Sequence, residues 1–187
     1  MPIKTLYLAG PDVFYPNAAE MGRQKQALCQ SLGLVGLFPL DNEVSGLQGR
    51  DLSHRIYQGN LDFMRHADAI IANITPFRGP GMDPGTAFEV GFFAALQKPI
   101  FLYSNRAALY EHRVLAASAA NGFSPRDEQG YLIESFGLAD NLMIIEAAAL
   151  PVECPPSDRP DTDQETFQRL LQRILAYPKT LNDTLLP

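Results

Sequence analysis

The chain has 187 residues, of which 46% are hydrophobic and 19% charged, an ordinary composition for one globular domain spanning residues 1–187. A net charge of −6 and a pI near 5.0 argue against a nucleic-acid-binding face, which needs a basic patch. No apolar run reaches the roughly 18 residues of a membrane span, and the N-terminus lacks a signal-peptide pattern. The two cysteines form no CxxC and the three histidines have no metal-ligand spacing, so we expect free thiols in a cytoplasmic protein without a metal site.

Short apolar runs alternate along the chain with longer stretches of helical periodicity. The predicted strands cover residues 5–9, 35–38, 69–74, 100–103 and 141–147. The predicted helices cover residues 18–32, 52–66, 84–96, 106–120 and 164–177. Residues 150–163 are rich in proline and charge, which indicates a tether before the C-terminal helix.

Strands that alternate with helices imply a parallel sheet with helices on both faces. We therefore predict an α/β fold with a flavodoxin-like, doubly wound sheet of five parallel strands in the order 2-1-3-4-5. The ligand cleft of such a sheet lies at the switch point between strands one and three, beyond their carboxyl ends. The loops that follow Ala9 and Ile74 flank this cleft.

A single carboxylate interrupts the most apolar predicted helix. Asp83-Pro84 is a typical helix start, because Asp accepts from free N–H groups and Pro has no N–H to lose. Glu89 follows within an apolar run, between Phe88 and Val90. Burying a charge is expensive, and helical side chains lean toward the N-terminus, so Glu89 points toward the predicted cleft unless it rotates out to solvent.

The motif around this carboxylate, DPGTAFEVG at residues 83–91, resembles the signature of the nucleoside 2-deoxyribosyltransferases. Three further pieces match in the same order: YLAG at residues 7–10 with Phe14, PLDN at residues 39–42 and DNLM at residues 140–143. Together they cover most of the chain. The resemblance implies exchange of purine or pyrimidine bases on 2-deoxyribose in nucleotide salvage, without a cofactor, and it makes Glu89 the nucleophile.

The resemblance also implies roles for other side chains. Tyr7 would hydrogen-bond the Glu89 carboxylate, Asp83 would handle the base besides capping its helix, and Phe14 would stack on the base. The expected catalytic residues are Glu89, Tyr7 and Asp83, and the expected substrate-binding residues are Asp12, Phe14, Glu43, Asn60, Gly85, Asn141 and Met143. Simpler roles are available to several of these residues, since Tyr7, Phe14 and Met143 suit a core and Glu43 suits a solvated loop.

Asn60 departs from the family pattern, because members of the family often carry Asp at this position. An amide can donate and accept hydrogen bonds but is no acid at neutral pH. The proton for the leaving base would then come from Asp83, Asp12 or Asp62, of which Asp62 lies on the wrong helix face. Glu43 can only accept, which would favour bases that present donors.

Two other functions compete with deoxyribosyl transfer. One is a 2'-deoxynucleoside 5'-monophosphate N-glycosidase, which would need a phosphate pocket, whereas residues 10–16 contain no Ser. The other is a non-catalytic nucleotide-binding module. The resemblance further implies that Asn141 and Met143 reach into the active site of a neighbouring subunit. We therefore expect at least a homodimer with shared sites, acting on deoxynucleosides and free nucleobases.

Overall fold

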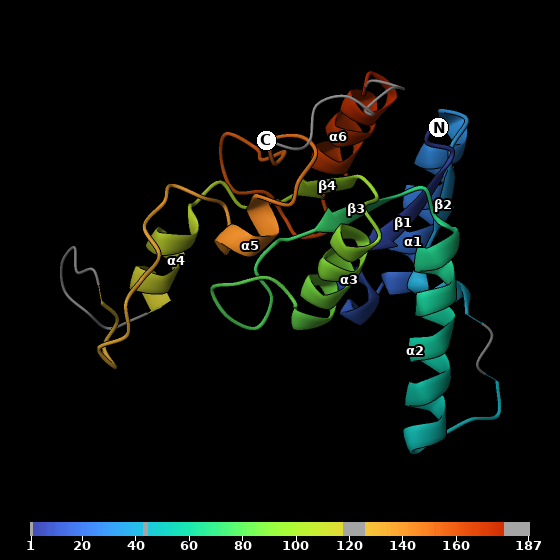
Figure 1. Ribbon diagram of the computed structural model, residues 1–187, viewed down its shortest axis with the longest axis horizontal. Helices are drawn as coiled ribbons and strands as arrows, with labels where there is room; N and C mark the ends of the chain where they lie inside the picture. Colours follow the sequence, from blue (N-terminus) through green and yellow to red (C-terminus); the bar gives the residue numbers. More distant parts are fainter. Residues whose placement is uncertain (1, 43–44, 118–125, 178–187) are drawn as a thin grey trace.

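A four-stranded parallel sheet organises the protein, seen in a computed structural model that describes residues 2–42, 45–117 and 126–177. The strands are β1 (Thr5–Ala9), β2 (Val35–Leu37), β3 (Ala69–Asn73) and β4 (Ile100–Tyr103). Their order is β2-β1-β3-β4 (Figure 1), with Tyr7 of β1 opposite Leu37 of β2 and Ile70 of β3. The α/β class, the parallel pairing and the order of these four strands agree with the prediction.

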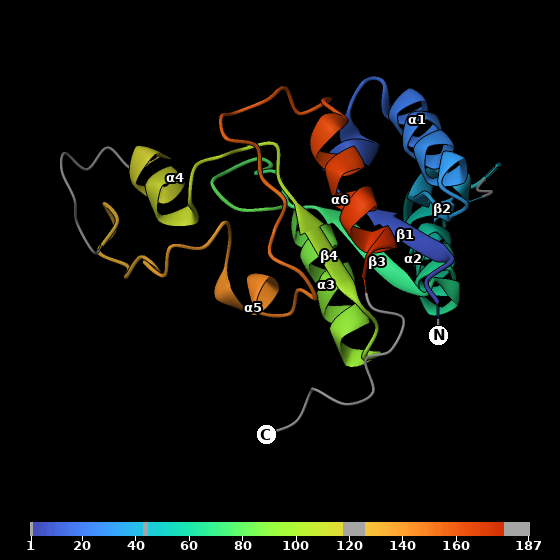
Figure 2. The ribbon, with the colours of Figure 1, turned by 90° about the horizontal axis from the view of Figure 1, so that it is seen from above.

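Helices cover both faces of this sheet. They are α1 (Ala18–Ser31), α2 (Gly49–His66), α3 (Pro84–Ala95), α4 (Tyr110–Ala117), α5 (Leu142–Ile145) and α6 (Glu165–Leu175), with short 3-10 helices η1 (Pro11–Phe14) and η2 (Pro39–Asp41). Figure 2 shows α1 and α6 on one side of the sheet and α3 on the other. Residues of α1 and α6 share one core cluster with the sheet, and residues of α2, α3 and α5 share a second.

The strand residues alternate between these two clusters. Leu6 and Leu8 of β1 face α1 and α6, whereas Tyr7 and Ala9 face α2 and α3. All four side chains are at most 2% exposed. Such burial on both faces is typical of a parallel sheet, and the alternation places the Tyr7 side chain beside α3.

The predicted fifth strand over residues 141–147 is wrong, because residues 142–145 form the short helix α5, which Asn141 and Glu146 cap. Residues 149–153 lie along the free edge of β4 instead, where Glu153 N donates to Leu102 O at 3.0 Å. In the register set by Glu153 opposite Tyr103, residue 151 would donate to Ile100 O. Pro151 has no N–H, and the N–H of Ala149 makes that bond at 2.8 Å. The sheet therefore has four strands and one interrupted edge segment, not five strands.

Helix α4 begins later than predicted. It starts at Tyr110 rather than at residue 106, because side chains bind the preceding N–H groups. Ser104 Oγ accepts from Arg106 N at 3.1 Å, and Asp158 Oδ1 accepts from Ala107 N at 2.8 Å. The predicted end of this helix lies outside the described residues. Across the described ranges, no helix is long and apolar enough to cross a bilayer.

Candidate active site

Tyr7 and Glu89 form a hydrogen-bonded pair between the sheet and α3. The Tyr7 hydroxyl donates to Glu89 Oε1 at 2.5 Å, and Tyr7 is 0% exposed. Burial raises the pKa of Glu89 to about 7, the Tyr7 hydrogen bond opposes this rise, and the Asp83 charge adds to it. Burial, followed by the Glu89 charge, raises the pKa of Tyr7, so the phenol stays a donor. Tyr7 therefore fixes the orientation of the Glu89 carboxylate, and this carboxylate titrates near neutral pH.

Asp83 caps the helix that carries Glu89. Its Oδ2 accepts from Thr86 N at 2.8 Å and from Thr86 Oγ1 at 3.0 Å, and Asp83 is 8% exposed. Its Oδ1 has no partner within the ranges that the structure describes. A Cβ on Gly85 would lie 3.0 Å from Asp83 Oδ2, so a glycine lets the cap close tightly. One oxygen of Asp83 is thus engaged in the cap and the other is available.

Asp12 belongs to η1, which follows β1, and is 1% exposed. Its Oδ2 forms an ion pair with Lys25 Nζ at 2.8 Å, and Asn73 Nδ2 lies 3.3 Å away. Gly10 makes this turn at φ 147°, where a Cβ would come within 2.6 Å of both Asp12 Oδ2 and Asn73 Cβ. In this arrangement Asp12 anchors the loop that carries Phe14.

Phe14 lies at the surface, 53% exposed, and stacks on Phe77 with ring centroids 5.1 Å apart. The Arg78 guanidinium lies 4.7 Å from the Phe77 centroid and 5.3 Å from that of Phe14. Residues 77–84 line an open cavity of about 400 Å³ that includes Asp83, a size suited to a small ligand. Phe77 was missed from the sequence because an aromatic in a loop is an ordinary feature.

Asn60 of α2 accepts a hydrogen bond from Asn42, which follows η2, at 2.8 Å between Asn42 Nδ2 and Asn60 Oδ1. Asn60 is half-buried. Its neighbour Leu61 belongs to the core cluster that contains Tyr7, so this part of α2 borders the same region of the fold. Glu43, the other residue predicted here for base recognition, lies outside the described residues.

Asn141 and Met143 lie at α5, which packs against α3. The Asn141 side chain donates to Glu134 Oε1 and Oε2 at 3.0 and 3.1 Å and accepts from Met143 N at 3.0 Å. It therefore bonds Glu134 rather than the Tyr7–Glu89 pair. Met143 is 72% exposed, so its side chain lies at the surface of the chain.

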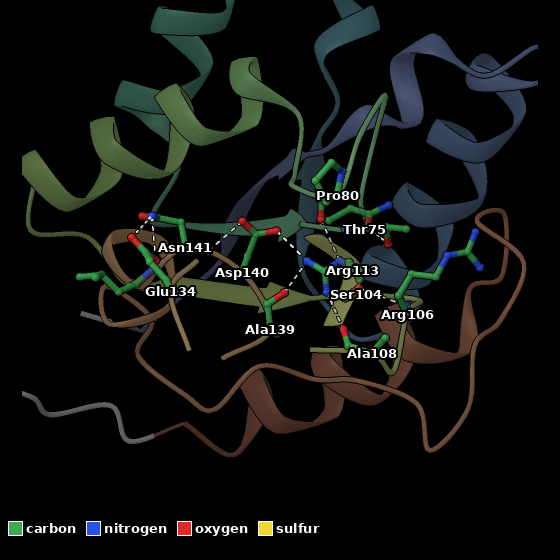
Figure 3. A network of polar contacts seen from close by, with 12 residues as sticks. Thr75, Pro80, Ser104, Arg106, Ala108, Arg113, Glu134, Ala139, Asp140 and Asn141 are labelled. Carbon is green, nitrogen blue, oxygen red and sulfur yellow. Dashed lines mark hydrogen bonds and ion pairs between the residues drawn. The ribbon is translucent and has the colours of Figure 1, made fainter. Parts of the chain in front are cut away.

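Arg113 connects the loop of residues 77–84, which lines the cavity, to residues 139–140 before α5 (Figure 3). Its Nε donates to Pro80 O at 2.8 Å, and its Nη2 donates to Ala139 O at 2.7 Å and Asp140 Oδ2 at 3.1 Å. Asp140 Oδ1 accepts from Asn141 N at 2.8 Å. Arg113 gave no signal in the sequence, since one arginine in a helix is usually solvated. It connects residues more than twenty positions away on both sides.

The comparisons with known proteins agree with this fold and identify the family. The family model for nucleoside 2-deoxyribosyltransferase matches residues 6–143. A 2-desoxiribosyltransferase from Leishmania mexicana superposes with a TM-score of 0.64 at 30% identity, over 90% of this chain and 97% of the other. Protein C191.05c of Schizosaccharomyces pombe, which is uncharacterized, is 30% identical over 159 residues, covering 75% of each chain.

A 2-deoxyribosyltransferase from Bacillus psychrosaccharolyticus shares the fold at 19% identity, with a TM-score of 0.53 over 77% of this chain and 82% of the other. On the family match and the 30% relatives, the chain belongs to the nucleoside 2-deoxyribosyltransferase family. The family prediction is confirmed. The roles of individual residues in this chain stay predictions.

Proposed function

We propose that this protein transfers 2-deoxyribosyl between purine or pyrimidine bases by double displacement at Glu89. One Glu89 carboxylate oxygen attacks C1' of the nucleoside as the C1'–N bond breaks, and the first base leaves with a proton. A nitrogen of the second base then attacks C1' from the opposite face as the bond from C1' to Glu89 breaks, and its proton returns to the group that protonated the first base. Two inversions give net retention, as in retaining glycosidases.

The observation that carries this proposal is the 2.5 Å hydrogen bond from Tyr7 to Glu89. A nucleophile must be held in one rotamer and must be ionised for part of the time at working pH. The bond supplies the first property, and a pKa of about 7 supplies the second. A carboxylate that served only as a solvated surface charge would need neither property.

We assign the proton on the leaving base to Asp83. Its Oδ1 has no partner among the described residues, and Asp83 borders the cavity of residues 77–84. Asp12 is a poorer candidate because it is 1% exposed and paired with Lys25. Phe14, with its exposed ring, would stack on the base, and Gly85 would let the sugar approach the start of α3.

The test is incubation of the protein with deoxyinosine and adenine, followed by chromatography for deoxyadenosine and hypoxanthine. Glu89→Ala and Glu89→Gln should each reduce the rate by orders of magnitude, and a slow 2-fluoro nucleoside should leave a glycosyl adduct on Glu89 of the wild type. Glu20→Gln, an exposed helical carboxylate, is the matched control. More than about 1% of the wild-type rate in Glu89→Ala would refute the nucleophile assignment.

The same assay separates the competing functions. Free deoxyribose formed from deoxyinosine 5'-monophosphate, without any new nucleoside, would indicate the N-glycosidase. Neither product would indicate a non-catalytic module.

We further propose a homo-oligomer of at least two subunits in which Asn141 and Met143 complete the neighbouring site. Two apolar side chains at α3 are exposed, Phe88 within the helix at 52% and Leu96 at its C-cap at 39%. Together with Met143, they support a second copy of this chain as the partner. Mixing Glu89→Ala with Asn141→Ala subunits under exchange should restore activity, because some mixed dimers contain one intact site. No recovery after confirmed exchange would refute the sharing.

A further inference from the structure

The hydrogen bonds around Asn42 determine which way its amide faces. Asn42 Nδ2 lies 3.0 Å from Pro39 O and 2.8 Å from Asn60 Oδ1. A backbone carbonyl can only accept, so the atom of Asn42 beside Pro39 must be its nitrogen. That nitrogen carries two protons, and the second proton goes to Asn60. The orientation of Asn42 thus follows from Pro39 O, a backbone carbonyl that can only accept a hydrogen bond.

The orientation of Asn60 follows from that of Asn42. Since Asn42 donates, the facing atom of Asn60 must be the acceptor Oδ1. The Nδ2 of Asn60 then points away from Asn42 with both of its protons free. Within the described part of the chain this nitrogen has no acceptor, and it is not sealed from solvent. A ligand can therefore take these donors.

Gly59 makes this pairing possible. A Cβ at this position would lie 2.6 Å from Asn42 Cγ, well inside the usual contact distance. Gly59 is buried in the middle of α2, where glycine costs helix stability. The close approach of Asn42 to α2 is a specific feature that this glycine permits.

Asn60 lies on a face of α2 that also contacts α3. Tyr57, three residues earlier and hence on the same helix face, packs against Phe88 with ring centroids 6.3 Å apart. Phe88 precedes Glu89 in α3. This part of α2 therefore lies beside α3, the helix that carries Glu89.

We propose that Asn42 is a positioning residue that holds the Asn60 amide as a hydrogen-bond donor, so that the site selects bases by an acceptor atom such as a purine ring nitrogen. This inference rests on the proposed transfer function and deepens it. Asn60 then recognises the base by donating a hydrogen bond to it, and does not transfer a proton to it. Asn42→Asp should abolish this selection, because a carboxylate only accepts and would turn the Asn60 Nδ2 toward itself.

The experiment measures binding of adenine and of 1-, 3- and 7-deazaadenine by calorimetry, with exchange rates measured in parallel. In the wild type, one of the three deletions should weaken binding about tenfold, because it leaves the Asn60 donor unpaired. Asn42→Asp should reduce that ratio to near one, and Asn42→Ala, which only frees the amide, should give a smaller reduction. Circular dichroism checks that each variant is folded.

The double variant separates positioning from general damage. In an Asn60→Ala background the ratio should already be near one, and Asn42→Asp should leave it unchanged. Equal binding of all four bases by the wild type, no adenine binding, or an unaltered ratio in Asn42→Asp would each overturn the inference. Because binding is measured without turnover, exchange through Glu89 with an unaltered ratio refutes only this inference, whereas adenine binding without exchange refutes only the proposed transfer.

Discussion

Replacing Tyr7 with Phe removes one hydroxyl from the site and should shift the pH at which the enzyme becomes active. The hydroxyl donates to Glu89 Oε1 at 2.5 Å and opposes the rise of the Glu89 pKa, which lies at about 7. A hydrogen bond to a charged group is worth about 1.5–3 kcal/mol, and one pKa unit corresponds to about 1.4 kcal/mol. Loss of the bond should therefore raise the pKa of Glu89 by about one to two units.

The sign of the rate change follows from the chemistry of attack. In the proposed mechanism only ionised Glu89 attacks C1', so kcat/KM should rise with pH through the Glu89 pKa. At pH 7 the ionised fraction should fall from about one half to a few per cent in Tyr7→Phe, a loss of roughly 5- to 50-fold. At pH 10, above both pKa values, most of this loss should disappear.

The assay is the pH profile of kcat/KM for deoxyinosine and adenine in the wild type and Tyr7→Phe. Tyr103→Phe is the control, because it removes another buried strand phenol, one that binds Lys25 on the other face of the sheet. Its profile should keep the wild-type midpoint. An unshifted midpoint in Tyr7→Phe, with activity lowered equally at every pH, would show that Tyr7 orients Glu89 without tuning it.

Three further outcomes are expected. Glu89→Gln should raise the free energy of unfolding at pH 8 by about 2 kcal/mol, because a folded-state pKa raised from 4.5 to about 7 costs the wild type stability as pH rises through 7. This gain in urea unfolding should vanish near pH 4, and a pH-independent difference would refute it. Arg113→Ala should destabilise the protein by about 3 kcal/mol, because it leaves the buried Asp140 carboxylate without its ion-pair partner. Arg65→Ala, which removes an exposed ion pair, should cost less than about 1 kcal/mol. Similar costs for the two variants would contradict a stabilising role of the Arg113–Asp140 pair. Inosine should be a far poorer substrate than deoxyinosine, because its 2'-hydroxyl withdraws electrons from the cationic transition state, and comparable kcat/KM values would argue against that transition state.

Local patterns in the sequence were enough to predict the centre of this fold. Apolar runs of strand length separate amphipathic stretches, and Asp83-Pro84 starts a helix in the structure as it does in the prediction. Such signals work because strand burial and helix capping depend on neighbouring residues. Four motifs in order were likewise enough to predict the family, because they span most of the chain.

The prediction of a fifth strand was wrong because contacts between distant parts of the chain decided the structure there. Residues 141–147 are apolar enough for a strand, but Asn141 caps a short helix there that packs against α3. The edge position beside β4 went to a segment with Pro151 in its middle, which no strand pattern favours. Periodicity reports which residues are buried, and it does not report which partner buries them.

The environment of each candidate site residue was likewise decided by contacts between distant parts of the chain. Asp12 meets Lys25 in the core, Asn42 meets Asn60 across 18 positions, and Arg113 joins two loops. The sequence alone determined which residues are candidates for functional chemistry, because residue type and motif are local. Only the tertiary structure decided whether each carboxylate or amide is paired, buried or free to meet a substrate, since that depends on groups brought together by the sheet and its crossovers.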